Sequence, residues 1–139
     1  MKLFLDTCIW FAGIHSEGGG SARILSEIEE RKFEIVATED LIEEIGCVVN
    51  RKLGKIGIEK LKKIIGKSSV TVHPATTTEE RKAWIGVTAD KDCLVLAGAL
   101  KCNADILVTL DKEHLLTEHV KKQFPVEVVN TKEFWKRFP

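Results

Sequence analysis

The sequence predicts a three-layer α/β/α sandwich around a mostly parallel, five-stranded sheet. Five short apolar runs lack strict alternation of polar and apolar residues, which is typical of parallel strands covered on both faces. Helical stretches separate these runs, and such an alternation of strands and helices indicates an α/β fold. No linker, repeat or low-complexity tract interrupts the 139 residues, so we expect one domain over residues 1–139.

Strands and helices follow one another along the whole chain. The predicted strands are Leu3–Leu5, Phe33–Ala37, Val70–Val72, Ile106–Val108 and Val126–Val129. The predicted helices are Thr7–Gly13, Ser21–Arg31, Thr38–Asn50, Glu59–Gly66, Thr78–Ile85, Asp90–Lys101, a stretch near Lys112–Gln123, and Thr131–Phe138. Ser21 and Thr38 are the expected N-caps of their helices, because a hydroxyl oxygen can accept a hydrogen bond from a free backbone N–H. The run Gly18–Gly20 does not follow a strand, so we interpret it as a surface turn and not as a phosphate-binding loop.

The composition excludes several classes of protein. The 21 Lys and Arg residues balance the 21 Asp and Glu residues, which argues against a globally basic nucleic-acid-binding protein. No apolar run approaches the roughly 20 residues of a membrane span, and Asp6 interrupts the first apolar run too early for a signal peptide. We therefore expect a cytoplasmic protein with no membrane partner. The four cysteines lack C-x-x-C spacing, which argues against a zinc site, and we expect them to be buried thiols.

Two aspartates come just after predicted strands. Asp6 follows the first strand directly, and Asp111 follows the strand Ile106–Val108 with Thr109 and one further residue between. Ligands of open parallel sheets bind beyond the carboxyl ends of the strands, near the point where the strand order reverses. If the two strands are neighbours, both carboxylates face one crevice. Taken alone, Asp6 fits the cap of the following helix as well as it fits a site, and Asp111 fits the start of a turn equally well.

Two further acids lie on predicted helices. Helical phase places Glu44 at the border of an apolar face, whereas Glu43 points nearly the opposite way. Asp92 stands at the amino end of a stretch that is apolar nearly all round, and Asp90 precedes it by two residues. The structural alternative for Glu44 is a position on the surface. The structural alternative for Asp90 and Asp92 is the first turn of a helix, where their charge stabilises the helix dipole.

A cluster of buried carboxylates needs a cation to offset its charge. Mg²⁺ and Mn²⁺ prefer carboxylate and water ligands. One or two such ions can polarise a phosphoryl oxygen, activate a water and stabilise the leaving oxygen. The acids therefore favour a Mg²⁺ or Mn²⁺ site that hydrolyses phosphodiester bonds.

Four segments, in order, resemble the motifs of PIN-domain nucleases. Met1–Thr7 is similar to their opening strand, which ends in Asp-Thr or Asp-Ser, and Thr38–Ile45 is similar to their helix with an inward Glu. The stretch Asp92–Lys112 resembles their buried, alanine-rich helix followed by a strand and T-x-D. Residues 126–135 resemble their final strand and helix. The resemblance covers essentially the whole chain, and the T-x-D segment is its most specific part.

The resemblance implies a VapC-like ribonuclease that uses Mg²⁺ or Mn²⁺ and is often the toxin of a toxin–antitoxin pair. Carried over by position, the catalytic and metal-binding acids are Asp6, Glu44, Asp92 and Asp111, and the supporting hydroxyls are those of Thr7 and Thr109. Spacing favours Asp92 over Asp90, and helical phase favours Glu44 over Glu43. The alternative is a catalytically weak PIN-like module that binds RNA or a protein. A dehalogenase-type phosphatase is disfavoured, because it needs a second Asp where this chain has Cys8.

Three groups of residues are candidates for partner contacts. Residues 51–67 carry seven basic residues and one acid, and we expect Arg51, Lys52 and Lys55 to contact RNA phosphates, with a solvated helix face as the alternative. Ile9–Phe11 and the helix near Ser21–Ile28 are candidates for a homodimer or antitoxin groove, with core packing as the alternative. The four histidines show no ligand-like spacing, and we expect His114 at the surface, with an approach to substrate as the alternative because it follows Asp111 closely.

Overall fold

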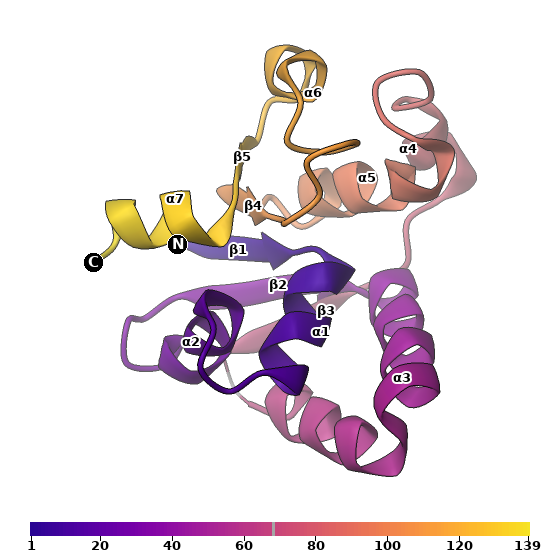
Figure 1. The fold of residues 1–139 in the computed structure, drawn as a ribbon. Coiled ribbons are helices and arrows are strands. Elements are labelled where there is room, and N and C mark those ends of the chain that lie inside the picture. Colours follow the sequence, from indigo (N-terminus) through magenta and orange to yellow (C-terminus); the bar gives the residue numbers. More distant parts are fainter. Residues whose placement is uncertain (68) are drawn as a thin grey trace.

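All strands of the central sheet run parallel, in the order β3-β2-β1-β4-β5 (Figure 1). The computed structural model describes residues 1–67 and 69–139. The strands are β1 (Lys2–Leu5), β2 (Glu34–Thr38), β3 (Val70–His73), β4 (Ile106–Val108) and β5 (Glu127–Val129). Each predicted strand is therefore present, with ends that differ by at most one residue. The sheet was expected to be mostly parallel, and every pairing of the described strands is parallel.

Helices cover both faces of this sheet. They are α1 (Thr7–His15), α2 (Gly20–Glu27), α3 (Glu39–Ile65), α4 (Thr78–Lys82), the 3₁₀ turn η1 (Asp90–Asp92), α5 (Cys93–Lys101), α6 (Glu118–Gln123) and α7 (Thr131–Arg137). In Figure 1, α1, α2 and α7 lie in front of the sheet and α5 lies behind it. The predicted three-layer α/β/α sandwich is confirmed.

The prediction for the second helix is wrong at both ends. Gly19 occupies the N-cap in extended backbone, and Ser21 lies inside the first turn with only 5% of its surface exposed. The glycine run thus supplies the helix start without a side-chain cap, and Ser21 packs inward. The helix ends at Glu27, before the predicted end at Arg31, and Lys32 then adopts a left-handed φ of 57°.

Two predicted helices, Thr38–Asn50 and Glu59–Gly66, are joined in α3 across a break at Gly54. Gly54 has φ 65° and ψ −153°, a conformation that glycine adopts without the steric penalty of a Cβ atom. Thr38 is the N-cap residue as predicted, although its side chain makes no capping hydrogen bond. Near the other end of the chain, Thr117 caps α6 by accepting a hydrogen bond from the Val120 N–H, so this helix begins later than predicted.

The other helices differ from their predicted bounds by smaller amounts: α1 ends at His15, two residues after the predicted Gly13, and α7 ends at Arg137, one residue before the predicted Phe138. Helix α4 ends at Lys82, not at the predicted Ile85, and the predicted helix Asp90–Lys101 begins with the tighter turn η1. Its helical part, α5, packs closely on the back of β1: a Cβ added at Gly98 would lie 2.7 Å from the Phe4 ring. Glycine therefore lets α5 approach the sheet closely enough to hold η1 near the end of β1.

The core takes up part of the surface that was considered for partners. Ile9, Trp10 and Phe134 are fully buried, so core packing accounts for the first two. All four cysteines are free thiols, and Cys47 is exposed, which corrects the expectation that all are buried. Among the described residues, no helix is both long enough and apolar enough to span a membrane.

Candidate active site

The site begins where β1 and β4 end side by side in the middle of the sheet. Leu5 pairs with Val108, and the backbone N–H of Asp6 donates to the Val108 carbonyl at 3.0 Å. β1 pairs with β2 on its other side, so the chain order of the strands reverses here. Open parallel sheets bind ligands at this kind of position. The pairing brings Asp6 and Asp111, 105 positions apart in number, to one end of the sheet.

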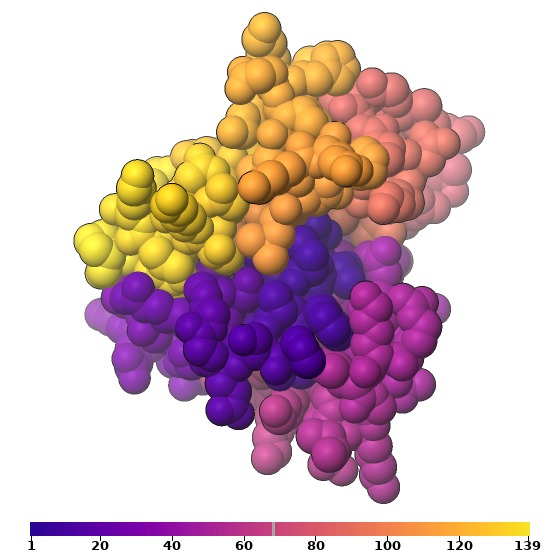
Figure 2. Space-filling model, viewed as in Figure 1, coloured from indigo at the N-terminus to yellow at the C-terminus, as the bar shows by residue number. Residues whose placement is uncertain are grey.

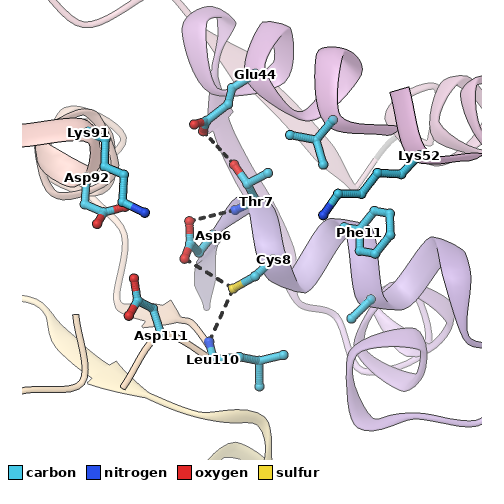
Figure 3. A pocket seen from close by; sticks show the side chains of 12 residues that line it. Asp6, Thr7, Cys8, Phe11, Glu44, Lys52, Lys91, Asp92, Leu110 and Asp111 are labelled. Carbon is cyan, nitrogen blue, oxygen red and sulfur yellow. Dashed lines mark hydrogen bonds between the residues drawn. The ribbon is translucent and has the colours of Figure 1, made fainter. Parts of the chain in front are cut away.

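A pocket of about 540 Å³ opens at this end of the sheet. Figure 2 shows the N-terminal segment (indigo) at the surface between part of α3 (magenta) and the chain after β4 (orange). The lining residues come from α1, α3, η1 and the segment after β4, and Figure 3 shows their side chains. They are Asp6, Thr7, Cys8, Phe11, Ala12, Glu44, Val48, Lys52, Lys91, Asp92, Leu110 and Asp111. All four acids proposed from the sequence therefore line one pocket.

Asp6 is held by a set of short contacts and is only 6% exposed. Its Oδ1 accepts a hydrogen bond from the Thr7 N–H at 2.8 Å and so caps α1. Its Oδ2 accepts from the Thr109 hydroxyl at 2.8 Å and from the Cys8 thiol at 3.2 Å. The structural role considered for Asp6 and a position in the site thus coexist, because Asp6 caps α1 with one oxygen and also lines the pocket.

Glu44 reaches the same pocket from α3. Its Oε2 accepts a hydrogen bond from the Thr7 hydroxyl at 2.7 Å, a contact visible in Figure 3. Glu43, the neighbouring alternative, is exposed. Thr7 therefore supports two acids at once, with its backbone N–H on Asp6 and its hydroxyl on Glu44.

Asp92, Asp111 and His114 form the tightest group of metal-binding side chains among the described residues. Their potential ligand atoms lie within 4.8 Å of one another. Asp92 comes from η1 and is 13% exposed, whereas Asp90, the alternative, is exposed. Asp111 Oδ1 accepts from the backbone N–H groups of Glu113 and His114, both at 3.0 Å.

Sequence reasoning placed His114 at the surface, and the structure places it at the edge of the site. Its Nδ1 lies 3.3 Å from Asp111 Oδ2 and 3.6 Å from Asp92 Oδ2, and its side chain is 35% exposed. The available signal was its position three residues after Asp111, within the turn that Asp111 organises.

The electrostatics of the site favour a bound cation. Burial, together with the charges of Asp6 and Asp111, raises the pKa of Asp92 from 3.8 to about 6. Asp92 Oδ2 is also buried and accepts no hydrogen bond. Burial and the charge of Asp6 raise the pKa of the Cys8 thiol to about 12, which keeps it protonated at neutral pH. A carboxylate oxygen without a donor, beside two further carboxylates, fits Mg²⁺ or Mn²⁺.

Basic side chains border the acids on two sides. The Lys52 ammonium lies 5.0 Å from the centre of the Phe11 ring and lines the pocket. Lys91, which the sequence reasoning did not single out, lines it beside Asp92 (Figure 3). Arg51 and Lys55 are exposed on α3 outside the pocket lining.

Several solved structures share this fold at low sequence identity. VapBC2 from Rickettsia felis, bound to a promoter DNA fragment, aligns with a TM-score of 0.63 and 17% identity over 94% of this chain and 98% of that chain. Mycobacterium tuberculosis VapC20, described as a sarcin–ricin loop cleaving toxin, aligns with a TM-score of 0.62 and 17% identity over 88% of this chain and 95% of that chain. VapBC-1 from nontypeable Haemophilus influenzae aligns with a TM-score of 0.65 and 13% identity over 95% of this chain and 99% of that chain.

A comparison with curated proteins found no match. A family model described as the PIN domain matches residues 2–113, a range that contains every acid of the pocket. The match agrees with the resemblance inferred from the motifs and with the fold of the similar structures. The chain belongs to the PIN domain family.

Proposed function

We propose that this PIN protein is a metal-dependent endoribonuclease of the VapC type. In this proposal Asp6, Glu44, Asp92 and Asp111 hold one or two Mg²⁺ or Mn²⁺ ions and promote hydrolysis of RNA phosphodiester bonds. The observation that carries the proposal is the convergence of these acids, from separate segments, on one pocket with an unpartnered Asp92 oxygen. A divalent ion supplies positive charge that polarises a phosphoryl oxygen and activates water.

The surrounding residues prepare the acids for this role. Thr109 donates to Asp6 through its hydroxyl and accepts from the Asp111 N–H at 3.1 Å, so one side chain sets the spacing of two acids. Thr7 links Asp6 and Glu44 in a similar way, with its backbone N–H donating to Asp6 and its hydroxyl donating to Glu44. Such fixed orientation lowers the reorganisation needed when charge develops in the transition state.

The attacking group in this proposal is water, and no covalent enzyme intermediate forms. Cys8 is the pocket's thiol, and its pKa of about 12 leaves almost no thiolate at neutral pH. The thiolate, not the thiol, is the nucleophilic form of cysteine. Cys8 instead donates to Asp6 and accepts from the Leu110 N–H at 3.4 Å, which ties α1 to the chain after β4.

Basic residues next to the acids are proposed to hold the RNA backbone. Lys52 and Lys91 line the pocket, and Arg51 and Lys55 extend the positive charge along α3. Phosphate contacts of this kind release counterions, so binding weakens as salt rises. We propose that Arg51, Lys52 and Lys55 contact phosphates that flank the scissile bond.

The likeness to named toxins motivates the substrate and partner. VapC20 is described as a toxin that cleaves the sarcin–ricin loop, and two other similar structures carry the VapBC name. By this likeness we propose an RNA substrate and an antitoxin partner for the present chain, and the homodimer expected from the sequence stays part of the proposal.

RNA cleavage with matched variants tests the proposal. An end-labelled single-stranded RNA is incubated with the protein in EDTA and then with Mg²⁺ or Mn²⁺. We expect cleavage only with metal, and a loss on the order of 10²–10³-fold for Asp6→Asn and Glu44→Gln. Glu43→Gln, which changes an exposed acid next to Glu44, is the control and should cleave at the native rate.

Two results would contradict the nuclease proposal. If the Asp6→Asn protein cleaves RNA as fast as the native protein, and circular dichroism shows both to be folded, the proposed active site is wrong. RNA that is bound but not cleaved with either ion would favour the alternative of a catalytically weak binding module.

A further inference from the structure

We propose that His114 is a direct metal ligand, and that it shifts the preference of this site from Mg²⁺ towards first-row transition ions such as Mn²⁺ and Co²⁺. The inference rests on the proposed function, because it concerns the same metal site. It extends the four-carboxylate set that the family resemblance implies by one imidazole nitrogen.

The spacing of the ligand atoms fits an octahedral ion. Nδ1 of His114 lies 3.3 Å from Asp111 Oδ2 and 3.6 Å from Asp92 Oδ2. Bonds of about 2.1 Å would set neighbouring ligands of such an ion about 3.0 Å apart. Shifts of a few tenths of an ångström would therefore bring the His114 nitrogen to this distance from both carboxylates, whose own ligand oxygens lie within 4.8 Å of each other.

The oxygens of Asp92 and Asp6 differ in a way that points to the ion's position. Asp92 Oδ2 is buried and has no hydrogen-bond partner, and the His114 nitrogen at 3.6 Å is too far away to serve as one. Both Asp6 oxygens, by contrast, already accept hydrogen bonds from protein groups. A cation placed between Asp92, Asp111 and His114 would give the unpartnered oxygen its missing positive neighbour.

The backbone holds His114 at this place. Its N–H donates to Asp111 Oδ1 at 3.0 Å, and its carbonyl accepts from the Thr88 hydroxyl at 2.7 Å. Thr88 belongs to the segment before η1, so one hydrogen bond links the two segments that carry Asp92 and Asp111. The backbone of His114 is therefore held from two directions, which keeps the imidazole near both carboxylates.

An imidazole ligand has a chemical consequence that a fifth oxygen would lack. Mg²⁺ is a hard ion that prefers oxygen donors, whereas imidazole nitrogen suits later divalent ions and strengthens along the series from Mn²⁺ to Cu²⁺. Loss of His114 should accordingly weaken Co²⁺ binding most, Mn²⁺ binding less and Mg²⁺ binding least. A histidine that only donated a hydrogen bond to Asp111 would affect all these ions alike.

Pulsed EPR of the Mn²⁺-loaded protein tests direct ligation without reference to activity. We expect ¹⁴N coupling from a bound imidazole in the native chain and in His119→Gln, a control at an exposed histidine of α6 outside the metal group. The coupling should vanish in His114→Gln. His114→Asp, which restores a ligand without nitrogen, should bind Mn²⁺ without the coupling and also covers the case in which the Gln variant folds poorly.

Calorimetric titration with Mn²⁺ and Mg²⁺ gives the second readout. We expect His114→Gln to lose about 10- to 100-fold in Mn²⁺ affinity, with Mg²⁺ affinity changed less than about threefold. Native Mn²⁺ binding without ¹⁴N coupling, or equal losses for both ions, would overturn the role of His114. If RNA is still cleaved in that case, the nuclease proposal stands. Conversely, ¹⁴N coupling in a protein that cleaves no RNA would support His114 as a ligand and contradict the nuclease proposal.

Discussion

Replacing Asp92 by Asn should stabilise the metal-free protein above pH 6. Burial and the charges of Asp6 and Asp111 raise the pKa of the Asp92 carboxyl from 3.8 to about 6. The folded carboxyl therefore binds its proton more tightly than the unfolded one. The stability that this proton contributes is fully present below pH 3.8 and is lost as the pH rises through about 6.

The size of the effect follows from the two pKa values. At 1.36 kcal/mol per pKa unit, the Asp92 carboxyl lowers the free energy of unfolding, relative to a neutral side chain, by about 3 kcal/mol at pH 8 and about 0.5 kcal/mol at pH 4. The side chain is only 13% exposed, so solvent screens little of this cost. Asparagine stays neutral between pH 4 and pH 8. The gain in free energy of unfolding from Asp92→Asn should therefore rise from about 0.5 kcal/mol at pH 4 to about 3 kcal/mol at pH 8.

Urea unfolding followed by circular dichroism, in EDTA at pH 4, 6 and 8, measures this advantage. Asp90→Asn is the matched control, because Asp90 lies in the same 3₁₀ turn and is exposed. We expect its free energy of unfolding to track that of the native chain within about 0.5 kcal/mol at each pH. An Asp92→Asn advantage that does not change with pH, or that Asp90→Asn shares, would refute the reasoning.

Further expectations concern packing, support of the acids and RNA binding. Gly98→Ala places a Cβ 2.7 Å from the Phe4 ring and should lower the free energy of unfolding in urea by about 1–2 kcal/mol. Gly46→Ala places its Cβ with no atom within 4 Å and should raise the free energy of unfolding by about 0.5–1 kcal/mol. Equal effects of the two variants would contradict this expectation. Thr109→Val leaves the Asp111 N–H without its acceptor and should cost about 1–3 kcal/mol by the same assay, and a native-like value would contradict it. Lys52→Ala should reduce the slope of log affinity for single-stranded RNA against log salt by about 0.7, and an unchanged slope would remove Lys52 from the RNA surface.

The strands and the inward acid of α3, Glu44, could be predicted from local patterns. The strands are short and apolar without alternation, so their positions were predicted within one residue. Glu44 faces the pocket and Glu43 faces solvent because α3 keeps a regular helical phase over these residues. The helix boundaries were harder, since a glycine at the N-cap of α2 and a break at Gly54 in α3 leave little trace in the hydrophobic pattern.

The composition of the site depends on contacts that no local pattern contains. Asp6 and Asp111 meet because β1 pairs with β4, and the strand order is a property of the whole sheet. His114 joins Asp92 through a hydrogen bond between Thr88 and His114, 26 residues apart. Its spacing from other histidines therefore said nothing about its surroundings, and its partly exposed side chain lies at the edge of the site beside Asp92 and Asp111.

Anomalous diffraction from a crystal soaked in Mn²⁺ tests the metal site most directly. We expect a manganese peak in the pocket, in contact with the carboxylates of Asp92 and Asp111 and within reach of Asp6. The same soak of an Asp92→Asn crystal should show a weaker peak or none. A manganese ion bound elsewhere on the chain, with the pocket free of anomalous signal at saturating Mn²⁺, would contradict the carboxylate site on which the proposed nuclease depends.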